Sequence, residues 1–578
     1  MSPRLRVYLA VLPKRPIKAM AIAWWWITRR RARAWGHLRT AAAELPNSYS
    51  LWLHVHQSVA LAQANEAELP PIAVHVHVAG REDAYALIAA VDSVRTQTFA
   101  RWSLYLTSTD CSLIEPVRDP RIHSLPTAFP DRATALAHVL KEAKEAWLIP
   151  LSADCELTPG ALEAFSQAVD PKQTAVLYAD QDELNATGQR SNPWFKPGWD
   201  KDLFLAQDYL SLACAIPVEP ARSVQMNSGG SDALAVQILL AGLLIGPGAL
   251  PARHVPYVAV STPAGAWCSK IAGRAELVRA VAGLPSSAGP FGTIAVHYPL
   301  PDTLPQVSVI IPTRDRLDLL ATSVEGVLHN TDYPAIELII ADNDSVEPET
   351  LDFLRHCARD PRVKIVRWPH PYNYSAINNF AVGEAGGSYI CLLNNDTEVI
   401  DRAWLREMMA HAVRPDVGAV GARLLYPDRS IQHAGVVVGM GNAAGHAHRG
   451  LPEGEPGYFA QALVAREATA VTAACLVVAK DRFEVVGGLD EDGLAIAYND
   501  IDLCLKLRRK GWRNIYVPQA VMIHHESKSR GMDFADENLA RYRRELAVFQ
   551  QRWNPADFAD PTHHRSLDQS SEQYRVAI

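Results

Sequence analysis

Two apolar runs in the second half of the chain have the length and composition of buried β-strands. They span residues 307–312 and 336–341 and are rich in valine, isoleucine and leucine. Apolar side chains at helical spacing follow both runs: Leu317, Leu320, Val324 and Val327 after the first, and Leu351 and Leu354 after the second. A third apolar run ends at Leu393. Strands that alternate with helices predict an α/β fold built on a parallel sheet.

A carboxylate follows each of these three strands closely. Asp315 comes after the first strand, Asp342 after the second and Asp396 after the third. Open α/β sheets bind ligands beyond the carboxyl ends of their parallel strands, so we expect the three acids to converge on one crevice. Mg²⁺ and Mn²⁺ prefer such carboxylate oxygens together with ligand phosphates. The alternative for Asn394-Asn395-Asp396 is an ordinary turn, because both residue types bond to their own backbone.

Several short motifs stand in an order that is typical of a known family. Three follow the strands: Pro-Thr-Arg-Asp at 312–315, Ala-Asp-Asn-Asp-Ser at 341–345 and Leu-Asn-Asn-Asp-Thr-Glu-Val at 393–399. Further motifs stand at 430–435, 445–450, 473–476, 486–490 and 498–508. The series resembles the family 2 glycosyltransferases, which have a GT-A fold, and especially the subgroup that builds bacterial O-antigen and related surface glycans, several of which are rhamnosyltransferases. The resemblance is dense over residues 300–550 and loose over 70–300.

The resemblance implies a nucleotide-sugar donor and a divalent cation, Mg²⁺ or Mn²⁺. In this family the loop after the first strand and the acid after the second hold the nucleobase and ribose, and the last aspartate of the third motif binds the cation on the diphosphate. The donor-binding residues implied here are Pro312, Thr313, Arg314, Asp315, Asp342, Asp344, Asn394 and Asn395. Asp396 becomes the metal ligand, although Asn394 stands where many members have a first aspartate.

Two adjacent histidines, His524 and His525, resemble the family's late histidine motif, in which an imidazole completes the metal site or touches the diphosphate. They follow an apolar run that predicts another strand. Successive strand residues point to opposite faces, so only one of the two can line the site. A structural histidine is the alternative for either.

Asp500 is the candidate general base. An inverting transfer needs one base to take the proton from the acceptor hydroxyl as that hydroxyl attacks the anomeric carbon. The family usually has Glu-Asp here, and Asn499-Asp500 keeps the second, base-carrying position. We expect Asp500 at the start of an amphipathic helix, which the apolar residues at 501, 503, 505 and 507 would anchor. An acid in a first helical turn also simply favours the helix dipole, which is the alternative.

Length and composition are those of a multidomain globular protein. A chain of 578 residues is too long for one hydrophobic core and indicates two or three domains. Its content of 48% hydrophobic and 21% charged residues is ordinary. The eight cysteines are scattered without paired spacing, which favours reduced thiols in the cytosol.

The amino-terminal segment differs from the rest in charge. The net charge of −7 combines +10 in residues 1–43 with −17 in the remainder. The Trp-rich run at 17–27 is shorter than the roughly 20 residues of a membrane span, and the arginines after it argue against a signal peptide. We expect peripheral contact with an anionic membrane, on the cytoplasmic face of the inner membrane. The alternative is a basic helix packed on the body. Nucleic-acid binding is disfavoured because the remainder is acidic and has no recognisable module.

An internal repeat relates the two halves of the chain. Residues 95–111 align with 328–345. In the first copy Ala-Gly-Arg-Glu at 79–82 stands where Pro-Thr-Arg-Asp stands in the second, and Ser108-Thr109 stands for Asp342-Asn343, so acids that would hold a nucleoside are missing. Asp154 aligns with Asp396, but Ser231 aligns with the candidate base. We interpret the first copy as catalytically degenerate.

The sequence thus predicts an α/β protein with tandem GT-A domains. The expected parts are a basic helical segment (1–70), a degenerate domain (71–300), a catalytic domain (301–550) and a polar tail (551–578). The leading hypothesis is an inverting, metal-dependent glycosyltransferase that moves a sugar from a dTDP-, UDP- or GDP-sugar donor, with dTDP-rhamnose as the first guess, to a lipid-linked or growing bacterial surface glycan. The alternatives are a noncatalytic glycan-assembly scaffold and a bifunctional transferase with both domains active.

Overall fold

The computed structural model describes residues 3–57, 61, 68–114, 119–226, 232–246, 248–269, 273–525 and 536–578. The chain forms two compact units. The first runs to Val296 and includes residues 563–568 and 575–578. The second comprises His297–Thr562 and residues 569–574.

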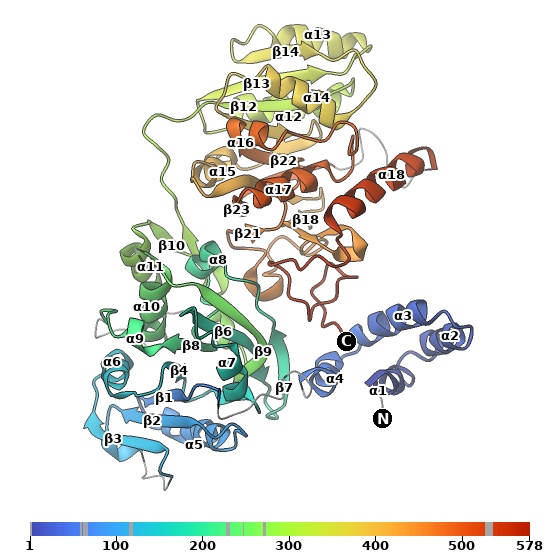
Figure 1. Ribbon diagram of the computed structural model, residues 1–578. Coiled ribbons are helices and arrows are strands. Elements are labelled where there is room, and N and C mark those ends of the chain that lie inside the picture. Colours follow the sequence, from blue (N-terminus) through green and yellow to red (C-terminus); the bar gives the residue numbers. More distant parts are fainter. Residues whose placement is uncertain are drawn as a thin grey trace. The chain divides into compact units, whose positions relative to one another are not determined.

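A mixed sheet forms the centre of the second unit (Figure 1). Its strands are β12 Val307–Thr313, β13 Ile336–Asp342, β14 Val363–Arg367, β15 Tyr389–Leu393, β16 Thr397–Val399, β17 Val417–Leu425, β18 Ile431–His433, β21 Arg466–Ala468, β22 Cys475–Ala479 and β23 Arg513–His524. The order is β14-β13-β12-β15-β22-β17-β23-β16, with β18 paired to β17 and β21 to β23. Strands β12 to β15 run parallel, and β22 is antiparallel to β15.

Helices cover both faces of this sheet. They are α12 Leu317–His329, α13 Pro348–Cys357, α14 Tyr374–Gly383, α15 Trp404–Ala412, α16 Lys480–Val485, α17 Asn499–Arg509 and α18 Asp536–Trp553. Alternation along β12 explains the two layers: Val309 and Ile311 pack in the same core as Val324 of α12, whereas Ile310 packs in the other core with Ile377 of α14. A short hairpin of β19 Val436–Val438 and β20 Ala444–His446 follows β18.

The first unit repeats the same sheet. Its strands are β1 Ile72–Val78, β2 Trp102–Ser108, β3 Ile122–Ala128, β4 Trp147–Leu151, β5 Glu156–Leu157, β6 Val176–Leu184, β7 Arg190–Trp194, β8 Cys214–Pro217 and β9 Ala252–Pro263. Their order, β3-β2-β1-β4-β8-β6-β9-β5 with β7 on β6, matches the second sheet strand for strand. Its helices are α5 Arg81–Arg95, α6 Arg132–Glu142, α7 Ala161–Ala168, α8 Lys201–Ala206, α9 Val218–Ala221, α10 Asp232–Leu244 and α11 Arg274–Ala282. The predicted tandem α/β fold is confirmed. The Pro-rich stretch after α11 contains a small hairpin, β10 Ser286–Ala288 with β11 Ile294–Val296.

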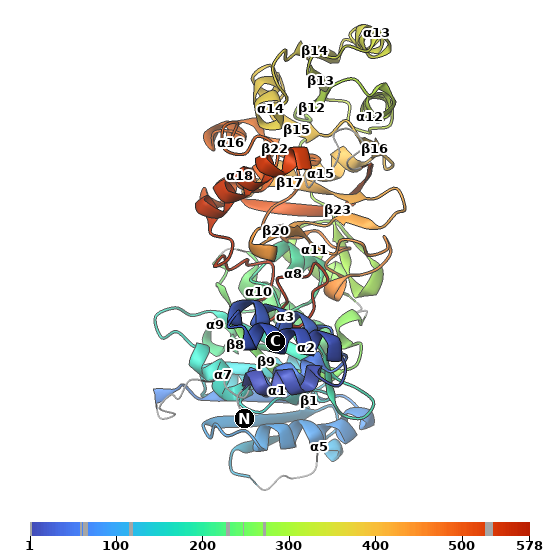
Figure 2. The same cartoon turned by 90° about the vertical axis from the view of Figure 1, so that its right-hand side faces the viewer.

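The amino-terminal segment is helical and belongs to the first unit. Its helices are α1 Pro3–Val11, α2 Pro16–Ile27, α3 Arg31–Ala43 and α4 Ser48–Val55. In Figure 2 the helices α1, α2 and α3 face the viewer. They share a small core that contains Val7, Ile22 and Leu38. No helix within the described ranges is both long and apolar enough to cross a bilayer.

Candidate active site

The carboxyl ends of β12 and β13 place Thr313 beside Asp342. The Oγ1 atom of Thr313 accepts a hydrogen bond from Nδ2 of Asn395, 3.2 Å away in the loop after β15. Asp342 is 5% exposed, and its Oδ1 accepts from the backbone N–H of Ser345 at 3.0 Å. Three donor-binding candidates therefore meet at one edge of the sheet, because parallel strands end at the same edge.

Asp315 ties the loop after β12 to the start of α13. Its Oδ1 accepts from the backbone N–H groups of Val346 at 2.8 Å and Glu347 at 2.9 Å. Its own N–H donates to Oγ of Ser345 at 2.8 Å. Its φ of 52° is the left-handed conformation, which is unfavourable for a residue with a Cβ. The hydrogen bonds of Asp315 thus define the conformation of the loop, and they offset the cost of its left-handed backbone.

The remaining donor-binding candidates on these loops differ in accessibility. Pro312 is buried within β12, whereas Arg314 is exposed. Asp344 forms an exposed ion pair with Arg367. Exposed ion pairs of this kind contribute little to stability.

Asp396 lies against the imidazole of His524. The Nε2 atom of His524 is 3.0 Å from Oδ1 of Asp396 and 3.3 Å from Nδ2 of Asn394. The two partners are nearly inaccessible, with Asp396 4% and His524 8% exposed. They meet because β16 pairs with β23 and places Thr397 opposite His524.

This donor set fits a divalent cation. Asp396 offers the hard carboxylate oxygen that Mg²⁺ and Mn²⁺ prefer, and the ring nitrogen of His524 favours a transition metal over Mg²⁺. Neighbouring ligands of an octahedral ion with bonds of about 2.1 Å lie about 3.0 Å apart. The two ligand atoms have this separation, at 3.0 Å.

His525 has a different partner. Its Nε2 lies 3.0 Å from Oε2 of Glu398, and its backbone N–H donates to the carbonyl of Asp396 at 2.9 Å. The side chains of consecutive residues diverge at the end of β23. Only His524 of the pair therefore contacts the candidate metal carboxylate.

Asp500 lies at the start of α17, beside the turn that precedes β22. Its Oδ2 accepts from the N–H of Ala473 at 3.0 Å, and its Oδ1 accepts from the N–H of Ile501 at 2.8 Å. The carbonyl of Ala474 accepts from the N–H of Asn394 at 3.1 Å. The Ala473-Ala474 turn thus connects the candidate base to the candidate metal motif. Burial raises the pKa of the Asp500 carboxyl above its ordinary value, although hydrogen bonds from backbone N–H groups oppose the shift.

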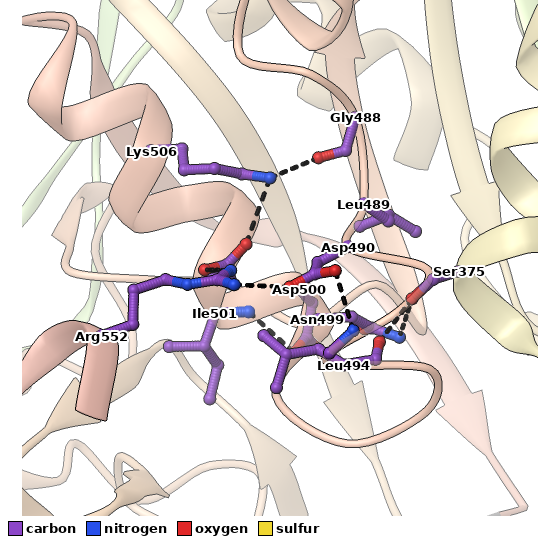
Figure 3. Close-up of polar contacts among 12 residues, drawn as sticks. Ser375, Gly488, Leu489, Asp490, Leu494, Asn499, Asp500, Ile501, Lys506 and Arg552 are labelled. Atoms are coloured by element: carbon purple, nitrogen blue, oxygen red, sulfur yellow. Dashed lines mark hydrogen bonds and ion pairs between the residues drawn. The ribbon is translucent and has the colours of Figure 1, made fainter. Parts of the chain in front are cut away.

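An ion network around the buried Asp502 anchors the helix that carries Asp500 (Figure 3). Asp502, whose side chain is 0% exposed, lies 2.8 Å from Nη1 of Arg552 and 3.1 Å from Nζ of Lys506. Nη2 of Arg552 also reaches Asp490 at 2.6 Å. Sequence reasoning gave Asp502 no role, although an acid between apolar helical positions was a usable signal. Arg552 fixes α18 against α17 through these contacts.

Gln432 also received no role from the sequence. Its Oε1 lies 2.7 Å from Nδ1 of His524, although the two residues are 92 positions apart. Gln432 is 5% exposed on β18. The contact depends on β18 and β23 flanking β17, and no local pattern encodes that arrangement.

The first sheet repeats the metal strands without the histidine. Glu156 on β5 pairs with β9 as Glu398 on β16 pairs with β23. Glu156 pairs with Ser261, which Thr262 follows. Glu398 pairs with Ile523, which His524 follows, so Thr262 stands where the second unit has the histidine. Asp154 is exposed, unlike its buried counterpart in the second unit.

Asp342 has no acidic counterpart in the first unit either. At the end of β2, Ser108 is buried and Thr109 donates its hydroxyl to the carbonyl of Ala79 at 2.8 Å. Ser231, the residue aligned with the candidate base, lies outside the described residues.

The described residues contain one group of three possible metal ligands whose ligand atoms lie close together, formed by Asp180, His254 and His564. Oδ1 of Asp180 lies 2.8 Å from Nε2 of His254, and Oδ2 lies 3.4 Å from Nε2 of His564. Burial lowers the pKa of His564 to about 4, so this ring is neutral at pH 7. Ser566 N–H donates to its Nδ1 at 3.0 Å, which leaves the ring proton on Nε2, facing Asp180. His254 and the backbone N–H of Lys196, which donates to Oδ1 of Asp180 at 2.8 Å, contact this carboxylate, whereas the buried Nε2 of His564 has no hydrogen-bond partner among the described residues.

Part of the second unit matches a known protein family. Residues 308–434 match the model of Glycosyl transferase family 2. The uncharacterized protein y4gI of Sinorhizobium fredii is 38% identical over 526 residues, which cover 86% of this chain and 58% of that protein. The O-antigen biosynthesis protein RfbC of Myxococcus xanthus is 34% identical over 560 residues, which cover 92% of this chain and 43% of that protein. The chain thus spans about half the length of these relatives.

Among solved structures, a mannosyltransferase from Pyrobaculum calidifontis in complex with GDP-Man and Mn²⁺ aligns with a TM-score of 0.34 and 19% identity, over 48% of this chain and 70% of that one. The family match covers β12 to β18, and with them the loops that carry Asp315, Asp342 and Asp396. The segment of the second unit that carries these residues is therefore similar to Glycosyl transferase family 2.

Proposed function

We propose that the second unit is an inverting, metal-dependent glycosyltransferase that uses a nucleotide-diphosphate sugar. The observation that carries this proposal is the arrangement around the Ala473-Ala474 turn. On one side Asp500 holds a carboxylate with a raised pKa, and on the other Asp396 pairs with His524. A base and a cation site joined by one rigid turn are the two parts that this transfer requires.

The donor occupies the edge formed by the strand ends. Thr313, Asp342 and Asn395 hold the nucleoside, and Asp396 with His524 holds the cation. A bound Mn²⁺ or Mg²⁺ supplies positive charge that stabilises the departing nucleoside diphosphate. The burial of Asp396 strengthens its attraction for a cation, because fewer waters compete for the carboxylate.

Asp500 accepts the proton of the acceptor hydroxyl. The acceptor oxygen forms a bond to the anomeric carbon while the bond from that carbon to the diphosphate oxygen breaks. Attack opposite the leaving group inverts the anomeric configuration. The raised pKa of Asp500 makes its carboxylate a stronger base than an exposed aspartate, and the N–H groups of Ala473 and Ile501 fix its orientation.

The acceptor that fits best is a growing bacterial surface glycan of the O-antigen type, carried on a lipid. The O-antigen biosynthesis relative, which aligns along 92% of this chain, supports that assignment. A dTDP-, UDP- or GDP-sugar is the donor class, with dTDP-rhamnose first among them.

Peripheral contact with an anionic membrane, on the cytoplasmic face of the inner membrane, completes the proposal. Along α2 the side chains of Ile17, Met20, Trp24 and Ile27 are 78%, 61%, 65% and 74% exposed. Their spacing of three, four and three residues puts them on one face of the helix. Seven lysines and arginines lie between residues 14 and 33, so apolar side chains and positive charge occur together. This combination is suited to the interface of an anionic bilayer.

Binding and turnover together test the enzymatic proposal. Nucleotide diphosphates and nucleotide sugars are titrated against the full chain with and without Mn²⁺, and donor hydrolysis or transfer is measured separately. We expect Asp396→Ala to lose metal-dependent binding and Asp500→Ala to retain it, with turnover lost in both. Retention of the donor's anomeric configuration in the product would contradict the single-base scheme. The absence of nucleotide binding in every form would favour a noncatalytic scaffold.

A further inference from the structure

We infer that Gln432 is a positioning residue that fixes the tautomer of His524 and thereby completes the cation site. The inference rests on the proposed metal site at Asp396 and adds a partner to it. The carbonyl oxygen of Gln432 holds the proton of His524 on Nδ1, so that the lone pair of Nε2 faces Asp396.

The contacts around the ring are those expected for this tautomer. The amide oxygen of Gln432 can only accept, so Nδ1 of His524, 2.7 Å away, is the donor. In the neutral imidazole Nε2 is then an acceptor, and Nδ2 of Asn394, 3.3 Å away, is a donor that can face it. Oδ1 of Asp396 also accepts, and it lies 3.0 Å from the same Nε2.

Two acceptors facing each other at this distance repel unless a cation or a proton lies between them. The structure encloses this pair, because Asp396 is 4%, His524 8% and Gln432 5% exposed. Burial in a medium of low dielectric constant increases the repulsion and equally increases the attraction for a cation. With the tautomer set by Gln432, Asp396 and His524 no longer form a hydrogen-bonded pair. They form a site in which each side chain offers one ligand atom to a cation.

The surroundings of β18 hold Gln432 in place. Its neighbour Ile431 is 0% exposed. On the opposite face of the strand, Nδ1 of His433 lies 2.9 Å from Nδ1 of His446, and Nε2 of His433 accepts from the N–H of Gly435 at 3.3 Å. Burial lowers the pKa of His446 to about 4, so these rings carry no competing charge at neutral pH. The motifs around residues 430–435 and 445–450 thus form a rigid support for the glutamine.

The internal repeat gives independent support. The strand pairings place Pro193 in the first unit where Gln432 stands in the second, and Thr262 where His524 stands. Proline has no side-chain acceptor, and threonine has no imidazole. Both partners are replaced together in the copy whose aspartate, Asp154, is exposed. The glutamine therefore accompanies the histidine, as expected for residues with a joint role.

Metal affinity is the first readout. Gln432→Met removes the acceptor with little change in volume, and Gln432→Glu keeps an acceptor at the same place. Free Mn²⁺ is measured by electron paramagnetic resonance during titration of the full chain. Loss of a partner that orients a metal ligand typically weakens affinity about 10- to 100-fold, and we expect this for Gln432→Met but not for Gln432→Glu. The matched control is Gln461→Met, another buried glutamine of the same unit, with wild-type affinity expected.

The tautomer itself is the second readout and requires no metal. Nitrogen-15 spectra of histidine-labelled, metal-free protein are compared with those of His524→Gln, which assigns the His524 signals by difference. We expect a protonated Nδ1 in the wild type and in Gln432→Glu, and a mixture of tautomers in Gln432→Met. A wild-type ring protonated on Nε2, or unchanged Mn²⁺ affinity in Gln432→Met, overturns the inference. A wild type that binds no Mn²⁺ contradicts the proposed function, and the tautomer in the metal-free protein still decides the role of Gln432.

Discussion

Nε2 of His524 lies 3.0 Å from Oδ1 of Asp396, across residues separated by 128 positions. The adjacent His525 makes an equally short contact with Glu398. One strand end thus presents two imidazoles to two different acids, and only one of those acids is buried. His524 and His525, which the sequence does not distinguish, therefore have different partners and different expected roles.

Substitution of the two histidines separates these tasks. We expect His524→Ala to weaken Mn²⁺ binding at least tenfold, because a ligand is lost from the buried carboxylate site. His525→Ala should leave the affinity within about twofold, since its contact with Glu398 is a partly exposed pair of small energetic weight. Calorimetric titration of both variants with Mn²⁺ measures the difference, and equal losses would contradict the assignment.

The aspartates of the two copies should differ in the same way. Asp154 is exposed and has Thr262 rather than a histidine at the matching strand position. We therefore expect Asp154→Ala to leave Mn²⁺ affinity and turnover unchanged, whereas Asp396→Ala abolishes both. Paired assays of the two variants test this, and an equal effect of Asp154→Ala would show that the first unit also binds the cation.

Turnover should depend on pH through Asp500. Burial raises the pKa of this carboxyl, and only its ionised form accepts a proton. Turnover is therefore expected to rise with pH through the raised pKa and to be lost as the pH falls below it. The measurement is kcat against pH at saturating donor and cation, with nucleotide binding followed over the same range. If kcat is half-maximal no higher than about pH 4, the ordinary range of an aspartate, the result would contradict a base with a raised pKa.

The raised pKa of Asp500 also affects stability, which should fall with rising pH whereas turnover rises. A raised pKa means that the folded state binds more protons than the unfolded state between the two values, so the free energy of unfolding falls as pH rises through this window. We expect Asp500→Asn to be at least as stable as the wild type at pH 7, and the difference to disappear below the ordinary aspartate pKa. Urea unfolding at two pH values checks this and separates lost catalysis from lost folding.

The Arg552 network should matter for stability. Arg552→Met leaves the buried carboxylate of Asp502 without its guanidinium partner, at a cost of about 1–3 kcal/mol. Turnover is expected to fall as well, because α17 positions Asp500. Arg355→Met is the matched control, since Arg355 pairs with Asp352 on the surface and should change stability by less than about 0.5 kcal/mol. Equal unfolding midpoints for the two variants would contradict the role of the network.

The exposed face of α2 should bind anionic vesicles. The full chain is expected to sediment with phosphatidylglycerol vesicles but not with phosphatidylcholine vesicles, and to dissociate at high salt. Trp24→Ser combined with Ile27→Ser should reduce binding at least tenfold, because both side chains are exposed on the apolar face. The control is Ile88→Ser, which removes an equally exposed apolar side chain from α5. Wild-type binding by the double variant would exclude this face.

The local pattern of apolar and polar residues predicted much of the fold. The runs at 307–312 and 336–341 became β12 and β13, and the helical spacing after them became α12 and α13. The alignment of 95–111 with 328–345 anticipated two sheets with one strand order. Strand and helix periodicity follows from which side chains are buried, so it is written in consecutive residues. The order of motifs likewise sufficed to indicate the family, which the match over 308–434 confirmed.

The partners within the site required the tertiary structure. From the sequence alone one can see that acids follow the strands and that two histidines stand where β23 ends. It does not show that His524 contacts Asp396 and Gln432, whereas His525 contacts Glu398. Those contacts depend on how β16, β17, β18 and β23 pair across more than ninety residues. Pairing register is set by the packing of the whole sheet, and a shift by one residue would turn the other histidine toward the metal carboxylate.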